Sequence, residues 1–157
     1  MSDFSVYKKL ELGRILSNSA ISNAAGPIAQ SHTRTEHHPI ANFSAALAES
    51  PVMISKYAAN VVSAQVTFSA SFVSNATDYN VVTVSKRTGN GAAVVVATTN
   101  FASTAGTSFT PTTITLSTNA ANTQLAAGDM VTCTIAKTGN GVANTPTAAI
   151  DIVLEDV

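Results

Sequence analysis

The residues with the greatest capacity for chemistry are three histidines that fall within one short stretch of the chain. His32, His37 and His38 share residues 31–39 with Glu36. Imidazole and carboxylate groups bind zinc, and a zinc site needs three or four such ligands. Neighbouring residues of an extended chain point in opposite directions, so His37 and His38 of one chain cannot both reach one ion. A symmetric oligomer that collects one histidine per subunit is an alternative, but we expect exposed or contact-forming histidines and no metal or other cofactor.

The single cysteine does not have the surroundings of a reactive thiol. Cys133 alternates with Val131 and Ile135 in a strand-like pattern, which predicts a buried side chain that behaves as a small apolar group. One cysteine cannot form an internal disulfide, so the fold must be held by packing. No histidine lies in the same part of the sequence to activate the thiol, and no Gly-x-Ser-x-Gly motif exposes a serine nucleophile.

The carboxylates do not converge in the sequence. Asp151, Glu155 and Asp156 form the densest group, at positions that we expect on the wetted face at the end of the last strand. Asp129 follows Gly128 in a predicted turn, where its side chain is expected to cap local N–H groups, and Asp78 sits in another turn. Acid–base catalysis needs groups that meet at one site. We therefore expect a protein that is not an enzyme.

Glycine-rich and aromatic motifs do not indicate a nucleotide or nucleic-acid site. Gly89-Asn90-Gly91 and Gly139-Asn140-Gly141 match hairpin turns rather than a phosphate-binding loop. Aromatic residues make up 6% of the chain and tryptophan is absent, which argues against base stacking and against a typical sugar-binding sandwich. Tyr57 and Tyr79 remain the candidates for stacking on a sugar.

The composition indicates a folded protein with an unusually neutral surface. Of 157 residues, 45% are hydrophobic, whereas only 11% are charged, against about 25% in an ordinary domain. A net charge of −1 argues against a nucleic-acid partner. No apolar run approaches the roughly 18 residues of a membrane span, and the start Met1-Ser2-Asp3-Phe4 lacks the layout of a secretory signal. We expect no membrane partner.

The second part of the chain has a period of two. From Val62 to Phe72 the even-numbered positions are apolar and the odd-numbered positions are polar. This alternation predicts a strand with one buried and one wetted face. Five further strands are predicted at Tyr79–Arg87, Ala92–Thr99, Thr113–Ser117, Met130–Ala136 and about residues 147–155.

Turn sequences join these strands. Thr88-Gly89-Asn90-Gly91 has the composition of a hairpin turn, and the same four residue types recur from Thr138 to Gly141. This repeat predicts one hairpin turn used twice. Short strands separated by turn-rich segments are typical of all-β folds. We predict an antiparallel β-sandwich, jelly-roll-like, over residues 57–157.

The first part of the chain has little regular pattern. Residues 1–56 hold five of the eight basic residues, all three histidines and a small, polar stretch around Gly26-Pro27. A long segment without periodicity is more often an arm or linker than part of a compact domain. We predict an extended, mostly irregular N-terminal arm over residues 1–56, with a short helix at 42–49, that wraps a neighbour. The alternative is that this segment folds back and adds edge strands to the sandwich.

The scarcity of charge indicates how the surface is used. Residues 57–157 contain only eight charged residues, and Thr, Ser, Asn and Ala dominate instead. Small neutral surfaces pack against other proteins without the cost of removing ions from water, and open sheet edges need to be covered. These properties predict a structural assembly protein with a sandwich, an interlocking arm and no catalytic centre.

The strand-rich part resembles virion proteins of tailed bacteriophages, and among them the capsid decoration (cement) proteins. The resemblance rests on the Ala/Thr/Asn/Val composition of residues 60–157 and on the turn Leu125-Ala126-Ala127-Gly128-Asp129, which leads into a Val/Thr strand. These motifs are generic and assign no role to a residue. The resemblance implies a jelly-roll-like sandwich that binds the outside of a capsid and bridges its subunits as a homotrimer, with the arm on the major capsid protein. It implies a virion location, on the capsid surface, and synthesis in the cytoplasm of a host cell.

The apolar residues of the arm are the candidates for partner contact. The sequence around these residues has too little periodic pattern for the arm to bury them by itself. They are Tyr7, Leu10, Leu12, Ile15 and Leu16. The alternative is that these residues pack on their own sandwich.

Two other function classes stay open. One is a phage tail or receptor-binding module that binds a cell-surface glycan, and the other is a bacterial surface or pilus-like subunit, which should carry a secretion signal.

Overall fold

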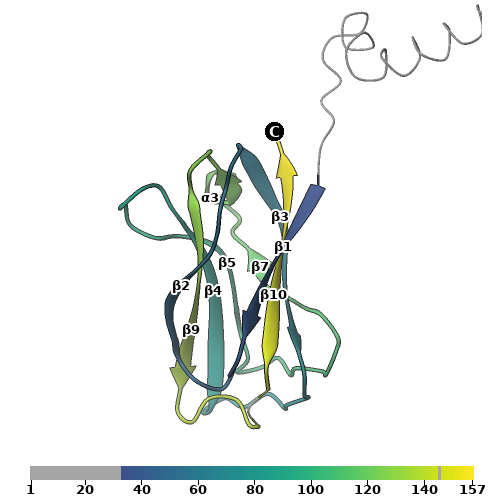
Figure 1. Ribbon diagram of the computed structural model, residues 1–157. Helices are drawn as coiled ribbons and strands as arrows, with labels where there is room; N and C mark the ends of the chain where they lie inside the picture. Colours follow the sequence, from purple (N-terminus) through teal and green to yellow (C-terminus); the bar gives the residue numbers. More distant parts are fainter. Residues whose placement is uncertain (1–32, 145) are drawn as a thin grey trace, which may run out of the picture. The chain divides into compact units, whose positions relative to one another are not determined.

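Alternating apolar and polar residues build two antiparallel sheets that face each other across a core (Figure 1). The computed structural model describes residues 33–144 and 146–157. The predicted all-β sandwich is confirmed. Six residues singled out in the sequence lie outside the described residues: Tyr7, Leu10, Leu12, Ile15, Leu16 and His32.

Ten strands and one short helix follow one another in the described part of the chain. The long strands are β1 (Thr33–Ile40), β2 (Leu47–Ile54), β3 (Ala59–Phe68), β4 (Tyr79–Arg87), β5 (Val94–Asn100), β9 (Met130–Thr138) and β10 (Ala148–Asp156). The short elements are β6 (Thr112–Thr113), β7 (Thr115–Leu116), α3 (Ala120–Thr123) and β8 (Gln124–Leu125).

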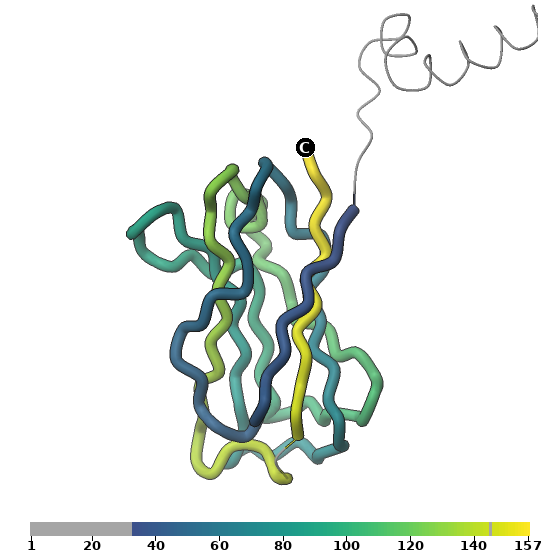
Figure 2. The backbone as a smooth tube through the Cα atoms, viewed as in Figure 1, coloured from purple at the N-terminus to yellow at the C-terminus, as the bar shows by residue number. Residues whose placement is uncertain are grey.

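The strands pair mostly with partners that are distant in the sequence. Sheet A has the order β1-β10-β3-β6, with β8 also paired to β3, and sheet B has the order β2-β9-β4-β5-β7. Strand β10 lies between β1 and β3 in sheet A, and β9 lies between β2 and β4 in sheet B. The pair β9 and β10 therefore runs between the pair β1 and β2 and the pair β3 and β4. This wrapping is the strand order of a jelly roll. Figure 2 shows the first and last described strands side by side in sheet A.

The strand predicted from Val62 to Phe72 is β3, but its period of two is interrupted once. The pairing with β10 jumps from Ser63 opposite Val153 to Val61 opposite Leu154, so Val62 forms a β-bulge. The bulge shifts the alternation by one residue, and Val62 is 43% exposed while Val61 is buried. The prediction of an inward Val62 is therefore wrong. Beyond the bulge, Ala64, Val66, Phe68 and Phe72 are buried as predicted, whereas Ala70 is half-buried and the strand ends at Phe68 rather than Phe72.

The repeated Thr-Gly-Asn-Gly sequence forms the same local turn twice but joins different elements. The N–H of Gly91 donates to the carbonyl of Thr88 at 3.0 Å, and the N–H of Gly141 donates to that of Thr138 at 3.0 Å. The first glycine of each copy has a φ near +57°, at +56° and +58°. The first turn connects β4 and β5 as a hairpin, whereas the second begins a link from β9 in sheet B to β10 in sheet A. The second hairpin prediction is therefore wrong.

The predicted irregular arm over residues 1–56 is wrong for its described part. Strand β1 forms the edge of sheet A and β2 the edge of sheet B, and no helix forms at 42–49. The alternative, a segment that folds back and adds edge strands, is observed for Thr33–Ile54. Half-buried positions of β1 carry Arg34, Glu36 and His38, and the register of β2 is irregular at two places. Neither edge strand therefore shows apolar alternation in its sequence.

Four phenylalanine rings close one end of the core. Phe43 lies between β1 and β2, Phe68 ends β3, Phe72 follows in the next link, and Phe101 follows β5. Each ring contacts the other three, with centroid separations from 4.7 to 6.1 Å, and five of the six pairs are edge-on. All four side chains are buried. We call them the phenylalanine cluster.

Backbone contacts fix the chain around the phenylalanine cluster. Gly106 exchanges two hydrogen bonds with Phe72, at 2.9 and 3.1 Å. A Cβ atom on Gly106 would lie 2.3 Å from the Phe72 ring and 2.9 Å from the Phe68 ring, so only glycine fits there. Asn80 is fully buried, and its side-chain amide donates to the carbonyl of Phe43. Its backbone carbonyl accepts from the N–H of Phe101 at 3.0 Å.

The phenylalanine cluster predicts unequal costs for two substitutions in one connection. Phe101→Ala removes a fully buried ring and should lower the free energy of unfolding by about 3–5 kcal/mol. Phe109→Ala, eight residues later at a side chain that is 78% exposed, should change it by less than about 0.5 kcal/mol. Urea denaturation followed by circular dichroism measures both. Equal costs would show that the cluster does not hold the fold.

Candidate interaction surface

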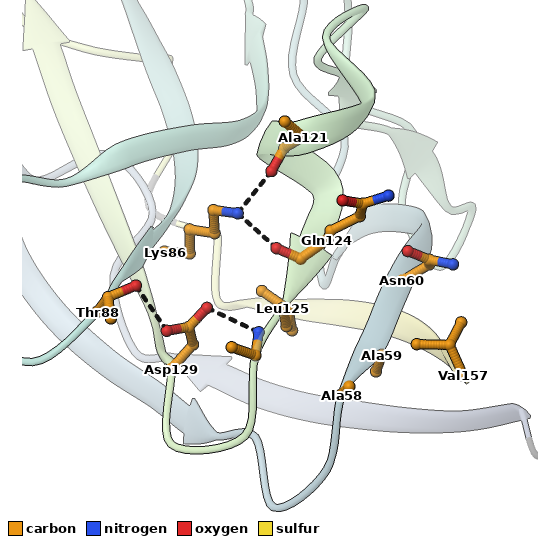
Figure 3. A pocket seen from close by; sticks show the side chains of 11 residues that line it. Ala58, Ala59, Asn60, Lys86, Thr88, Ala121, Gln124, Leu125, Asp129 and Val157 are labelled. Atoms are coloured by element: carbon orange, nitrogen blue, oxygen red, sulfur yellow. Dashed lines mark hydrogen bonds between the residues drawn. The ribbon is translucent and has the colours of Figure 1, made fainter.

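A hollow beside α3 holds a charged side chain (Figure 3). Its volume is about 630 Å³. The Lys86 ammonium donates to the backbone carbonyl of Ala121 at 2.6 Å and to that of Gln124. These carbonyls belong to the short helix and the strand that follows it, so Lys86 holds this segment against β4. Its donors are engaged with the chain's own backbone rather than directed at a ligand.

Asp129, in the same hollow, also binds its own chain. One carboxylate oxygen accepts from the Thr88 hydroxyl at 2.7 Å, and the other accepts from the N–H of Ala126 at 2.9 Å (Figure 3). The side chain is 3% exposed. The predicted capping role of Asp129 is confirmed by its bond to Ala126. Asp78 accepts from the N–H of Asn140, which is distant in the sequence, at 2.7 Å. This hollow is therefore built as a joint between loops.

The histidine-rich stretch lies on edge strand β1. The Nδ1 atom of His37 lies 2.7 Å from a carboxylate oxygen of Asp151 on the neighbouring strand, and this pair is exposed to solvent. His38, the next residue of the strand, is half-buried. Within residues 33–144 and 146–157, no group of three or more metal-binding side chains lies together.

Cys133 is fully buried in β9 between the two sheets, as the sequence predicts. Burial raises the pKa of its thiol to about 12, because the charged thiolate is disfavoured away from water. A thiol with this pKa remains protonated at neutral pH, so Cys133 contributes packing.

Glu49 and Arg87 form a clamp on sheet B that joins β2 to β4 across β9. The guanidinium of Arg87 donates to both carboxylate oxygens of Glu49, at 2.6 and 2.5 Å, and the Thr132 hydroxyl adds a third bond at 2.7 Å. The hydrogen bonds from Arg87 and then from Thr132 lower the pKa of the Glu49 carboxyl from 4.5 to about 2.

An apolar groove lies on the outer face of sheet A, and we call it the Phe109 groove. Its volume is about 510 Å³. The residues that form its outer wall and floor include His37, Pro39, Thr67, Phe109, Thr147 and Ala149. The side chain of Phe109 is 78% exposed, which is unusual for a phenylalanine. A large exposed apolar side chain beside an apolar hollow is typical of a protein interface.

The backbone holds Phe109 in its exposed position. Its φ is +55°, in the left-handed region that a side chain of this size rarely adopts. The N–H of Phe109 donates to the carbonyl of Phe68 at 2.8 Å, and the N–H of Thr110 donates to that of Thr107 at 3.2 Å. These bonds keep the ring outside the core, so its exposure is a built feature of the loop.

The face around the groove is almost without charge. Three rows of residues cross β1, β10 and β3 in register. They are Pro39–Ala149–Thr67, His37–Asp151–Gln65 and Thr35–Val153–Ser63. In these rows the charged groups are confined to the His37–Asp151 pair. This face therefore presents little charge to a partner.

The sequence does not single out Phe109 as a contact residue. The sequence around Phe109, including Ser108 and Thr110, has no periodic pattern. The residue types alone do not distinguish a buried phenylalanine from an exposed one. The available signal is a lone aromatic residue within a Thr/Ser/Pro segment between two strands.

Comparison with known proteins supports the fold. The chain is similar to a chain of the cyanophage Pam1 capsid asymmetric unit, with a TM-score of 0.50 and 13% sequence identity, over 85% of this chain and 91% of that chain. No protein-family model matches the sequence, and no curated protein does. In the described residues, no helix is long and apolar enough to cross a membrane.

The Glu49–Arg87 clamp predicts a specific dependence of stability on pH. A folded-state pKa below the unfolded value means that the clamp stabilises the fold fully above pH 4.5 and loses this contribution as the pH falls toward about 2. Glu49→Gln should therefore lower the denaturation midpoint at neutral pH, and its difference from the wild type should shrink between pH 4.5 and about 2. Urea titrations at a series of pH values measure this difference.

Arg87→Met supplies the control for this experiment. With the guanidinium removed, Glu49→Gln should have little further effect at any pH, because the main cause of the lowered pKa is gone. A pH-independent difference between Glu49→Gln and the wild type would contradict the clamp.

Proposed function

We propose that this protein is a virion structural protein that binds the outside of a phage capsid. The observation that carries the proposal is the neutral outer face of sheet A with Phe109 exposed beside its groove. The similarity of fold to a cyanophage capsid unit supports a virion location. The occupant of the Phe109 groove would be an uncharged, apolar element of a capsid subunit, since this face offers no unpaired charge to a charged partner.

The proposed work is adhesion by burial of apolar surface. Each square ångström of apolar area removed from water contributes about 25 cal/mol before the costs of association. A face of three strands, each about nine residues long, covers roughly 400 Å² of sheet, from a strand spacing of about 4.8 Å and a rise of about 3.3 Å per residue. A stable complex usually buries about 800 Å² on each partner. One sheet face alone would therefore bind weakly.

Additional contacts would supply the missing area, and we propose two. One is the apolar set of the N-terminal segment, Tyr7, Leu10, Leu12, Ile15 and Leu16, on the major capsid protein. The other is association into a homotrimer, which would place three such faces on one site and raise the avidity. A complex of this kind bridges capsid subunits and stabilises the shell without a catalytic centre.

Phe109 is the first test of the capsid contact. Phe109→Ser should weaken binding to capsids at least about ten-fold, because a central aromatic side chain is a typical binding hot spot. Val95→Ser, a similar loss on sheet B at a side chain that is 43% exposed, is the matched control and should leave binding unchanged. Co-sedimentation of each full-length variant with capsids that lack this protein measures the affinity. Equal binding by Phe109→Ser and the wild type would exclude the groove as the contact.

Deletion of residues 1–20 is the second test. The truncated protein should keep the thermal unfolding midpoint of the full chain, because every described strand lies after residue 32. Its binding to capsids should fall below detection in the same co-sedimentation assay. Unchanged binding would show that Tyr7, Leu10, Leu12, Ile15 and Leu16 are not the partner contacts.

A further inference from the structure

A second hollow lies on the outer face of sheet B, in the layer opposite the Phe109 groove. Its volume is about 310 Å³, and it is formed by β4, β5, β7 and the loop that follows β5. The polar side chains that line it include Tyr79, Thr98, Asn100, Ser103, Thr104 and Thr115. None of its lining residues is charged. We call it the Tyr79 hollow.

Several polar groups of the Tyr79 hollow are available to a ligand. The hydroxyls of Tyr79, Ser103, Thr104 and Thr115 have no hydrogen-bond partner within the part of the chain that the structure describes. The Thr98 hydroxyl, by contrast, donates to the carbonyl of Val82 at 3.1 Å. The hollow therefore combines one aromatic ring with a set of hydroxyl groups that each donate and accept.

The loop that carries Ser103 and Thr104 is fixed at both ends. At one end the N–H of Phe101 donates to the carbonyl of Asn80, and the Phe101 ring is buried in the phenylalanine cluster. At the other end Gly106 exchanges two hydrogen bonds with Phe72. A ligand would lose little affinity to loop ordering, because the loop is already held in place.

Tyr79 is held in a similar way. It pairs with Thr138 at the start of β4, and its half-buried ring packs against the core. A ring that is packed on one side and open on the other is a fixed platform for an apolar ligand face. Tyr57, the other tyrosine considered for this role, instead lines a hollow with Arg34, Glu36 and Lys56, which would favour a charged ligand.

We propose that the Tyr79 hollow binds one residue of a neutral carbohydrate. A pyranose ring has an apolar face that can stack on Tyr79 and several hydroxyls that can bond with the hydroxyls of the hollow. A sialic or uronic acid would gain nothing from its carboxylate here, because no cationic side chain lines the site. The proposal is independent of the capsid contact, since it concerns the opposite sheet.

The affinity of one site should be low. A few neutral hydrogen bonds and one stacking contact in an open hollow correspond to a Kd of about 1–10 mM. Many copies on one particle would raise the effective affinity for a surface rich in the same sugar. Such a site would hold a particle near a glycan-covered surface without fixing it there.

The experiment is a titration of the full-length, isotope-labelled protein followed by two-dimensional NMR. The probes are the methyl glycosides of glucose, galactose, mannose and N-acetylglucosamine, with sialic acid and glucuronic acid as charged comparisons. At least one neutral glycoside should shift the amide signals of residues 79, 98–104 and 115 in a saturable way. The two acids should bind more weakly than that glycoside.

Variants separate binding from folding. Thr115→Val keeps the shape of an exposed side chain and removes its hydroxyl, so it should weaken binding about five-fold, the worth of one neutral hydrogen bond. Thr113→Val, on the neighbouring short strand in sheet A, is the control and should bind as the wild type does. The proposal is overturned by the absence of saturable shifts for all four glycosides, by shifts confined to other residues, by tighter binding of an acid, or by equal effects of the two variants.

Discussion

The four rings of the phenylalanine cluster are the contact on which the functional surfaces depend. The rings come from three connections and from the end of β3, and these segments lead into strands of both sheets. The connection from Phe101 to β6 runs directly out of this cluster and is anchored again at Gly106. Between these two anchors it contributes to the Tyr79 hollow, and beyond the second it exposes Phe109. One packed cluster thus positions a loop that serves opposite faces of the sandwich.

Several of the few charged residues act as clamps within the domain. Glu49 and Arg87 join three strands of sheet B, Arg34 binds Asp156 between the first and last described strands, and Lys86 holds the segment around α3. Because these charges are paired or bonded internally, the faces between them stay neutral. Low overall charge in the sequence therefore corresponds to neutral surfaces, as expected for a protein that packs against others.

The sequence predicts the fold class and most strands, and it fails where tertiary contacts decide. Strand β4 is predicted with its observed bounds because its alternation is uninterrupted. A single bulge at Val62 reverses the predicted orientation of that residue, and a bulge leaves no mark in the residue types. Edge strand β1 carries polar residues at its half-buried positions, and edge strand β2 has an irregular register. Neither therefore shows the apolar alternation that predicts a strand, and their sequences resemble an irregular arm. The repeated turn is predicted correctly as a turn, but its use depends on which sheet the next strand joins.

The candidate surfaces were less predictable than the fold. Tyr79 was identified by its residue type, whereas the hydroxyls beside it come from separate strands and a loop that only the folded chain brings together. Phe109 differs from the four buried phenylalanines by its backbone conformation, which has a positive φ. The neighbouring residue types do not reveal this conformation. The apolar residues Tyr7, Leu10, Leu12, Ile15 and Leu16 lie outside the described residues, and their role stays a prediction.

The pairing of β1 with β10 also orders the events of synthesis. Thr33 lies opposite Glu155, so the first described strand cannot pair with β10 until residues 148–156 have left the ribosome. Long-range pairing of this kind slows folding, because loop closure must precede the gain from contacts. Of the long strands, only β4 and β5 can pair as neighbours during elongation. Loss of β10 would therefore leave β1 and β3 with unpaired edges, and chains of this kind are prone to aggregate.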